Sequence, residues 1–494
     1  MSLVPPAAAA STGSTIVKDR LFIGGEWLSP ASGRTIKVIS PHTEEVIATV
    51  PEADGTDIDR AVAAARAAFE DGPWPRTSPA ERAAVIRAVS AGIQARMQEF
   101  SDTVTAEMGA PSTFALFGNT LAATTVLDGY AELLDTFRFE EERAGILGPV
   151  LVTKAPVGVC AGIVPWNVPL FLIAMKIGAS LASGSTMVIK SAPETPLTGY
   201  LLAEVLESVG LPPGVINIIT ADRENSELLV RHPGLDKVSF TGSTAVGRRI
   251  GAICGEQLKR CTLELGGKSA AILLDDADLG AALPALLSAA FLNTGQVCAA
   301  QTRVLAPRSR YQEVVDGLAD LVGGAKVGDP ADPETLVGPL VAARQRDRVE
   351  GLIHAGVDEG ARLVRGGGRP AALDRGWYVE PTLFADVDNR MRIAQEEIFG
   401  PVLSVIPFDG EDEAVRIAND SAYGLSGSVW TGDPAHGAAV GRRVRTGVLA
   451  VNSGTVVDPK NPFGGFKQSG IGRELGPEGL EAYLETQSIV LPKG

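Results

Sequence analysis

The sequence predicts an α/β fold with more than one domain, because of its length and the order of its apolar segments. A chain of 494 residues is long for one hydrophobic core, and a prior of roughly 150 residues per domain gives two or three domains. Over residues 159–265, short apolar runs alternate strictly with helical patterns. Such alternation indicates a parallel sheet covered by helices on both faces. Residues 266–466 repeat it less regularly, and we expect a second α/β domain there.

The segment before the alternating region predicts elements of other kinds. Residues 1–20 are rich in Ala, Pro and Ser and lack the regions of a signal peptide, so we expect a disordered tail. Residues 21–50 predict small hairpins, because Gly-Gly, Ser-Gly and Pro-His-Thr break short alternating apolar segments. Residues 137–157 become charged and then strand-like, which makes them a candidate interface. Apolar residues at helical spacing predict helices at 58–69, 80–98 and 120–134.

The alternating region gives a definite set of strands. They are predicted at residues 159–164, 187–189, 215–219, 238–240 and 262–265, with helices between them. A strand at 270–274 and a helix at 279–291 begin the second domain. Ligands of such sheets bind at the carboxyl ends of the strands, so the residues that follow these strands are candidate site residues.

Composition restricts the partners and the compartment. With 45% hydrophobic and 21% charged residues, the chain is typical of soluble globular proteins. A net charge of -15 argues against nucleic acid or an anionic membrane as the main partner. The chain has no apolar run of about 20 residues, so no membrane span is predicted. Four scattered cysteines suit a reducing compartment, and we expect a cytoplasmic protein. The four histidines lie far apart, so no metal site is expected.

One cysteine, Cys298, lies among small and polar residues directly after the predicted helix 279–291. A thiol placed this way can be exposed, approached by backbone amides and held as a nucleophilic thiolate. The alternative is a small buried apolar residue, which is the usual state of a lone intracellular cysteine. Three other reactive groups framed by Gly or Pro favour the nucleophile, namely Asn167, Glu264 and Glu397.

Each of these groups also has a plainer interpretation. Glu264 ends an apolar strand before two glycines, which predicts a buried carboxyl with a raised pKa, suited to a base; the alternative is a solvated carboxylate. Asn167 lies in a stiff segment between prolines and can donate to an oxyanion if it faces Cys298; otherwise it marks a turn. Glu397 and Phe399 could equally be a helix-end charge and a core aromatic residue.

Residues 240–247 (Phe-Thr-Gly-Ser-Thr-Ala-Val-Gly) follow a predicted strand and open a helix, as a dinucleotide-binding turn does. Thr244 replaces the second glycine of the GxGxxG pattern, so the motif alone is a weak signal, and such turns also occur without a ligand. A Rossmann interpretation places an acidic ribose ligand about 20 residues further on, close to Glu264. That offset gives Glu264 a second candidate role.

The blocks around Asn167, Glu264, Cys298 and Glu397, in this order and at these separations, resemble the aldehyde dehydrogenase superfamily. The resemblance extends from about residue 21 to the C-terminus. It implies a Rossmann-like cofactor domain, a second α/β catalytic domain and a small β oligomerisation arm. The implied segments are 21–135 and 158–263 for the cofactor domain, 264–479 for the catalytic domain, and 136–157 and 480–494 for the arm.

The resemblance implies an enzyme that oxidises an aldehyde to a carboxylic acid and forms a homodimer or homotetramer. In it, Cys298 is the nucleophile, and Asn167 with the Cys298 backbone N–H stabilises the oxyanion. Glu264 matches the general base of the family rather than a ribose ligand. Lys176 and Glu474 match positions that are linked to proton relay.

The cofactor implied by the resemblance is NAD, with NADP as the alternative. Lys190 matches the residue that bonds the adenosine ribose, and a lysine can donate to hydroxyls or to a 2′-phosphate. Many NAD-preferring members carry Glu three residues further on, where this chain has Pro193 and then Glu194. Glu397 and Phe399 match residues at the nicotinamide ribose and ring. The expected cofactor contacts are Ile163, Pro165, Trp166, Lys190, Glu194, Phe240, Gly242, Ser243, Gly247, Leu265, Glu397 and Phe399.

The substrate tunnel implied by the resemblance is apolar. Betaine-aldehyde members place Trp where this chain has Met175, and succinate-semialdehyde members use Arg in the same helix, so a neutral, hydrophobic aldehyde is expected. Two alternatives remain. CoA-acylating relatives generally lack the base that Glu264 supplies, and a non-catalytic relative would not need the intact set of reactive groups. The expected tunnel residues are Leu170, Met175, Val297, Ala299, Val457 and Phe463.

Overall fold

The computed structural model describes residues 15–454 and 457–492, and its first α/β unit is built on an eight-stranded sheet. The strand order is β20-β12-β11-β8-β9-β10-β2-β3. The five central strands are parallel, and each overlaps one of the predicted strands. They are β8 (Val159–Ile163), β9 (Thr186–Ser191), β10 (Ile216–Thr220), β11 (Lys237–Thr241) and β12 (Arg260–Glu264). Outside them lie β2 (Leu21–Ile23), β3 (Glu26–Leu28) and β20 (Gly470–Ile471), which pair with their neighbours in antiparallel fashion; β3 and β20 are the edges.

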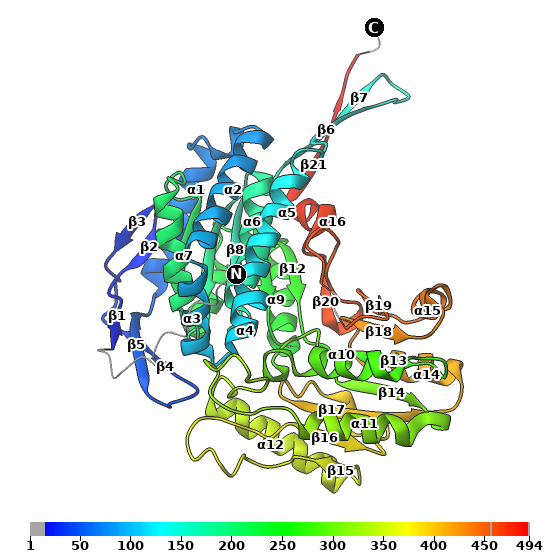
Figure 1. Cartoon of the computed structure of the whole chain (residues 1–494). Coiled ribbons are helices and arrows are strands. Elements are labelled where there is room, and N and C mark those ends of the chain that lie inside the picture. The colour runs from blue at the N-terminus through cyan, green and yellow to red at the C-terminus, as the bar shows by residue number, and fades with distance from the viewer. Residues whose placement is uncertain (1–14, 455–456, 493–494) are drawn as a thin grey trace, which may run out of the picture.

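Helices cover both faces of this sheet (Figure 1), as the alternating pattern predicts. Side chains of alternating strand residues enter two separate apolar clusters, so Cys160 and Met187 pack on one face and Val159 and Val188 on the other. The first face is covered by α2 (Pro79–Ala95), α5 (Ala122–Leu133), α6 (Pro169–Ser183) and α7 (Leu197–Ser208). The second is covered by α1 (Gly55–Glu70), α8 (Arg223–Arg231) and α9 (Thr244–Glu256).

The helices before β8 are more broken than the sequence predicts. Ser78 and Glu81 form a capping box at the start of α2, but the predicted helix 80–98 ends at Arg96, which leaves helical geometry at φ -116° and ψ 21°. A new helix, α3 (Met97–Met108), follows. The predicted helix 120–134 is the end of a longer one that includes a π-helical stretch. Its parts are α4 (Ser112–Phe114), η2 (Ala115–Leu121) and α5, and a short helix η1 (Trp74–Arg76) precedes α2.

The second α/β domain has a seven-stranded sheet of order β15-β16-β17-β14-β13-β18-β19, parallel except for β15. Its strands are β13 (Ala270–Leu273), β14 (Arg303–Pro307), β15 (Arg362–Arg365), β16 (Thr382–Ala385), β17 (Val402–Phe408), β18 (Gly427–Trp430) and β19 (Ala450–Val451). Helices α10 (Leu279–Phe291) and α11 (Tyr311–Gly323) cover one face, and α12 (Ala343–Asp358), α14 (Glu411–Asn419) and α15 (Pro434–Gly441) the other. Short helices are η3 (Leu292–Gly295), η4 (Arg308–Arg310), α13 (Arg392–Gln395), η5 (Lys467–Ser469) and α16 (Gly476–Glu481).

The hairpins predicted for residues 21–50 are confirmed. The expectation that the disordered tail extends to residue 20 is wrong. β2 pairs with β3, and β4 (Thr35–Ile39) pairs with β5 (Val46–Pro51), both antiparallel. Of the predicted disordered tail, residues 1–14 lie outside the described residues. Residues 16 and 17 form β1 (Ile16–Val17), which pairs in parallel with β5, and Lys18 forms an ion pair of 3.0 Å with Glu204. The backbone of the tail therefore joins a sheet before residue 20.

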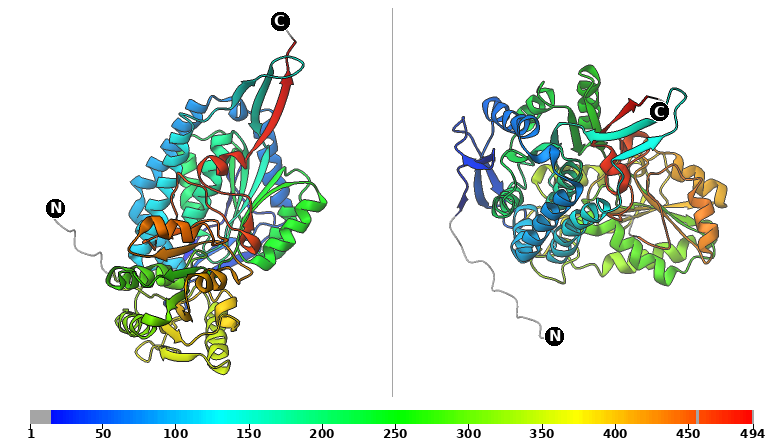
Figure 2. Two further views of the ribbon diagram at one scale, coloured as in Figure 1. Left: turned by 90° about the vertical axis from the view of Figure 1, so that its right-hand side faces the viewer. Right: turned by 90° about the horizontal axis from the view of Figure 1, so that it is seen from above.

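A three-stranded antiparallel arm projects from the body of the molecule (Figures 1 and 2). It consists of β6 (Glu140–Arg143), β7 (Val150–Pro156) and β21 (Leu484–Val490), in the order β21-β7-β6. The strand-like character predicted for residues 137–157 is thus confirmed.

The proposed domain limits stay a prediction. β20 lies inside the proposed catalytic segment, yet it pairs with β12 of the first sheet. None of the described helices is long and apolar enough to cross a membrane.

Candidate active site

Cys298 follows a strained loop that leads out of α10. Asn293 and Thr294 have left-handed backbones, with φ of 52° and 60°. This conformation costs about 1–2 kcal/mol for each residue with a side chain, and such strain gathers at functional sites. Buried contacts hold the loop, since Thr294 Oγ1 accepts a hydrogen bond of 2.9 Å from the backbone N–H of Gly338. The loop therefore presents Cys298 in a fixed position.

Asn167 is tied to the same loop from the other side of the site. Its Nδ2 donates to the carbonyl of Gln296 at 2.9 Å, and Asn293 Nδ2 donates to the Asn167 carbonyl at 2.8 Å. The Asn167 side chain is buried, and its second amide N–H is left for another acceptor. The structure thus brings together Asn167 and the loop of Cys298, which lie more than 120 residues apart in the sequence.

The thiol of Cys298 is partly exposed, and its surroundings favour the protonated form. Burial, with the carboxylates of Glu397 and Glu264, raises the pKa of Cys298 to about 12, although the backbone amides of Ala299 and Cys298 act to lower it. At neutral pH the thiol is therefore protonated in this state. A positive charge brought to the site would favour the reactive thiolate.

Glu264 ends β12, and its side chain is only 3% exposed. Neither carboxyl oxygen has a hydrogen-bond partner among the described residues. Burial raises the pKa of Glu264 well above its usual value, the carboxylate of Glu474 adds to this effect, and Lys176 and Arg473 oppose it. The solvated alternative is therefore wrong, and the buried carboxyl has the raised pKa that suits a general base.

A closed polar network lies in the same part of the sheet. Lys176 on α6 forms an ion pair of 2.7 Å with Glu474, and both side chains are almost fully buried. Lys176 Nζ also donates to Ser239 Oγ at 3.1 Å and to Thr241 Oγ1 at 2.9 Å, and Ser239 donates to Glu474 at 2.9 Å. Both charged partners of this network act on the pKa of Glu264, so they belong to its electrostatic environment.

Glu397 lies against the glycine pair that follows Glu264. Its Oε1 accepts a hydrogen bond of 3.0 Å from Gly267 N, and a Cβ on Gly266 would lie 2.4 Å from its Oε2, so the carboxyl group packs closely against this glycine. Burial raises the pKa of Glu397 to about 7. Phe399, with a left-handed φ of 61°, packs edge-on against Trp166 at 5.4 Å between ring centroids.

The turn between β11 and α9 is open to solvent and structurally suited to an anion. Ser243 is exposed and caps α9, accepting from Val246 N. The N-terminus of this 13-residue helix favours negative charge. Gly247 lies against Leu265, where an added Cβ would approach the leucine side chain to 2.4 Å. The glycine thus allows α9 to pack closely on the segment that follows β12.

At the carboxyl end of β9, Lys190 is buried near two carboxylates. Burial lowers the pKa of Lys190 to about 8, while the charges of Glu194 and Asp222 raise it. Glu194 forms an ion pair with Arg344, so it is already bound by a partner from the second domain.

Comparison with known proteins settles the family. The sequence model described as "Aldehyde dehydrogenase family" matches residues 27–489. The chain belongs to the aldehyde dehydrogenase family. Geranial dehydrogenase of Castellaniella defragrans is 47% identical over 97% of this chain and 99% of its own length. These findings confirm the predicted family and the enzyme class.

Solved structures agree in fold. An aldehyde dehydrogenase of Mycobacterium tuberculosis in complex with NAD+ has a TM-score of 0.96 and 50% identity, over 97% of this chain and 99% of that one. A mutant of aldehyde dehydrogenase C of Pseudomonas syringae, in complex with NAD+ and octanal, has a TM-score of 0.93 and 42% identity, over 96% of both chains. The α/β fold predicted for this family is confirmed.

The six residues expected to line the aldehyde tunnel all belong to one apolar cluster, which Cys298 also contacts. Leu170, Met175, Ala299 and Phe463 are buried, and Val297 and Val457 are partly buried against the same cluster. Phe463 is also joined to Glu474 by two backbone hydrogen bonds, of 2.7 and 2.8 Å. These residues therefore give Cys298 apolar neighbours, in addition to the carboxyl groups of Glu397 and Glu264 that act on its pKa.

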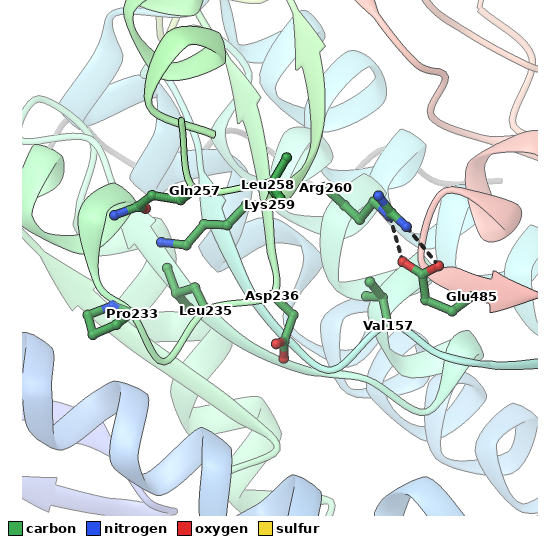
Figure 3. A pocket seen from close by; sticks show the side chains of 9 residues that line it. All are labelled: Val157, Pro233, Leu235, Asp236, Gln257, Leu258, Lys259, Arg260 and Glu485. Atoms are coloured by element: carbon green, nitrogen blue, oxygen red, sulfur yellow. Dashed lines mark hydrogen bonds and ion pairs between the residues drawn. The ribbon is translucent and has the colours of Figure 1, made fainter. Parts of the chain in front are cut away.

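A surface pocket of about 680 Å³ lies elsewhere, between the end of α9 and the base of the arm (Figure 3). Arg260 and Glu485 form an ion pair of 2.6 Å at its edge. None of the residues predicted for the aldehyde dehydrogenase site lines it.

Several residues of the site were not predicted from the sequence. Ser239 and Thr241 occupy alternate positions of the buried strand β11, where a polar side chain needs a partner, and this pattern could have revealed them. Lys268 is 2% exposed, its Nζ has no hydrogen-bond partner among the described residues, and burial lowers its pKa to about 7. The position of Lys268 directly after Gly266 and Gly267 in the motif that contains Glu264 could have indicated it from the sequence.

Proposed function

We propose that this protein oxidises a neutral, hydrophobic aldehyde to the carboxylic acid with NAD+, and that Cys298 is the nucleophile. The observation that carries the proposal is that all six expected tunnel residues pack in one apolar cluster, against which Cys298 also packs. An apolar wall favours an aldehyde with a hydrocarbon chain and disfavours a charged semialdehyde. Relatives named for geranial and crystallised with octanal support this substrate class.

The residues present fit a dinucleotide cofactor. The open turn at Ser243 and the start of α9 suit a pyrophosphate, Lys190 suits the adenosine ribose, and Glu397, with one carboxyl oxygen bound to Gly267 N, suits the second ribose. Trp166 and Phe399, which pack edge to face, are aromatic residues that suit the nicotinamide end. The remaining expected contacts that frame these groups are Ile163, Pro165, Phe240, Gly242, Gly247 and Leu265.

We propose NAD+ rather than NADP+ as the preferred cofactor. Glu194 and Asp222 both act electrostatically on Lys190, the expected ribose ligand. A 2′-phosphate bound there would lie near these two carboxylates, and like charges repel. The two hydroxyls of an NAD ribose carry no such penalty. Solved relatives that contain NAD+ support the same choice.

Bound NAD+ supplies a hydride acceptor and a positive charge. The Cys298 thiolate attacks the aldehyde carbonyl, and the free amide N–H of Asn167 with the Cys298 backbone N–H stabilises the oxyanion. Oxidation leaves the acyl group as a thioester on Cys298. Glu264 then takes a proton from water, which hydrolyses the thioester, and Lys176 and Glu474 set the proton affinity of Glu264.

We further propose a cytoplasmic homodimer or homotetramer that assembles through the arm. The tip of the arm carries Ile146 and Leu147, which are 92% and 76% exposed, and Val490 of β21 is 59% exposed. Exposed apolar side chains on a projecting hairpin are typical of a protein interface. All four cysteines are free thiols, which suits a reducing compartment.

The direct test is formation of reduced cofactor with octanal, geranial and succinate semialdehyde, using NAD+ or NADP+, with and without CoA. We expect the highest kcat/KM for octanal or geranial with NAD+ and no need for CoA. Cys298→Ala should abolish turnover, whereas the matched variant Cys160→Ala, at a buried thiol of β8, should keep it. A preference for the charged semialdehyde would contradict the substrate class, and a strict need for CoA would contradict hydrolysis through Glu264.

A further inference from the structure

Helix α6 begins in the protein interior without a capping side chain of its own. Val168, at the N-cap position, makes no side-chain hydrogen bond, and Pro169, at the first helical position, has no N–H. Leu170 is fully buried, so its backbone N–H and that of Phe171 need an acceptor from elsewhere in the protein. A buried helix start without such an acceptor would be costly.

Asn119, about fifty residues earlier in the chain, supplies this acceptor. Its Oδ1 accepts hydrogen bonds from Leu170 N at 3.1 Å and from Phe171 N at 3.4 Å. The Asn119 side chain is fully buried, and its Nδ2 has no partner among the described residues. These two amides are the ones that an N-cap side chain normally binds. Asn119 thus acts as the cap of α6 from a different helix.

The π-helical stretch η2 brings Asn119 to this position. Widening of the helix over residues 115–121 changes the face that Asn119 presents, and such π-helical turns are frequent at functional sites. Gly118 is required for the packing, because a Cβ there would approach the ring of Phe114 to 2.4 Å. Thr120 Oγ1, next in the same stretch, donates to the Ala115 carbonyl at 2.9 Å. The π-helical stretch therefore carries the acceptor that caps α6.

We propose that Asn119 is a positioning residue that fixes the first turn of α6 and thereby sets the acyl-chain preference of the site. This first turn carries Leu170, which packs in the apolar cluster that Cys298 contacts, and it begins two residues after Asn167. Asn119 acts through the backbone N–H groups of Leu170 and Phe171 and does not touch the substrate. The role in chain preference rests on the proposed function, whereas the cap itself does not.

Two substitutions separate the acceptor from the rest of the side chain. Asn119→Asp keeps an acceptor oxygen and replaces the amide nitrogen, which is unpartnered, and a carboxylate at a helix N-terminus is favoured. Asn119→Leu has a similar volume but no acceptor. Asn119→Ser, whose hydroxyl is too short to reach both amides, serves if the leucine variant fails to fold. Thr120→Val is the matched control, because it removes a buried hydroxyl of the same π-helix.

The first readout is hydrogen–deuterium exchange of the peptide that spans residues 168–173, which needs no activity. We expect exchange about fivefold faster or more in Asn119→Leu or Asn119→Ser, and wild-type rates in Asn119→Asp and Thr120→Val. The second readout is the ratio of kcat/KM for octanal to that for propanal, which should fall about fivefold in the same two variants only.

The outcomes are distinct. Unchanged exchange in Asn119→Leu and Asn119→Ser, or an Asn119→Asp variant as damaged as Asn119→Leu, would overturn the cap. Faster exchange with an equal loss for both aldehydes would overturn the role in chain preference. If the wild-type protein oxidised neither aldehyde, the proposed function would fail, while the exchange data would still decide the cap.

Discussion

Lys176 and Glu474 form an ion pair of 2.7 Å with side chains only 0% and 2% exposed, and both charges act on the buried carboxyl of Glu264. Removing one partner of a buried pair leaves the other charge uncompensated, at a cost of about 3–5 kcal/mol. The pair is therefore retained in the folded protein, and its two charges have opposite effects on the pKa of Glu264. Glu474 raises the pKa of Glu264, and Lys176 lowers it by a smaller amount.

The first prediction separates the effect of Lys176 on the pKa of Glu264 from the effect of Glu474. Lys176→Met should raise the pKa of Glu264 further and move the acid limb of the kcat–pH profile to higher pH, and it should lower the free energy of unfolding by about 3–5 kcal/mol. The double variant Lys176→Met/Glu474→Gln leaves no charge buried, so most of the stability should return. Its acid limb should move below that of the wild type, because the larger of the two effects is lost. Acid limbs that move in the same direction would refute this electrostatic account.

The second prediction concerns how the buried carboxyl of Glu264 makes the free energy of unfolding depend on pH. Because the pKa of Glu264 is raised in the folded state, the folded protein binds this proton more tightly than the unfolded chain does. The contribution of Glu264 to stability is thus complete below the ordinary pKa of glutamate and is lost as the pH rises through the raised value. Glu264→Gln should therefore gain stability relative to the wild type as the pH rises above about 5, by at most about 1.4 kcal/mol per pH unit. Chemical unfolding across this range would measure it, and a constant difference would count against a buried, proton-binding Glu264.

The third prediction concerns the choice of cofactor. Glu194→Ser removes a carboxylate that acts on Lys190 and also frees Arg344, which Glu194 binds. A free guanidinium is a good phosphate ligand, so kcat/KM for NADP+ relative to NAD+ should rise about tenfold. Glu45→Ser is the matched control, since it breaks an exposed pair with Arg375 in another part of the protein. An unchanged ratio in Glu194→Ser would show that these charges do not select the cofactor.

The sequence predicted those parts of the fold that depend on local pattern. The strands β8 to β12 are apolar runs between helical segments, which is the pattern of a parallel sheet that is buried on both faces. Cys298 was a candidate because of its small and polar neighbours after a helix, and Glu264 and Asn167 because Gly or Pro frames each of them. The sequence did not show how these residues meet around one loop. The hydrogen bonds from Asn167 to Gln296 and from Asn293 to Asn167 were seen only in the structure.

Other features depend on partners that are distant in the sequence. The pairing of Ile16–Val17 with β5 requires a strand about thirty residues away, and the helical pattern of residues 80–98 carries no sign of the break at Arg96. The cap of α6 by Asn119 follows from a π-helical stretch that no periodicity reveals. An asparagine in a helical segment is normally a neutral or unfavourable residue there, so its role was not visible.

The central claim is that Cys298 carries the acyl group and Glu264 releases it. We would therefore incubate Glu264→Gln with NAD+ and octanal and determine the intact mass and the modified peptide. The account predicts one octanoyl group on Cys298, formed together with about one equivalent of reduced cofactor per chain and released slowly, and no adduct in Cys298→Ala/Glu264→Gln. Reduced cofactor without an acyl group on Cys298, or an adduct on another residue, would contradict it.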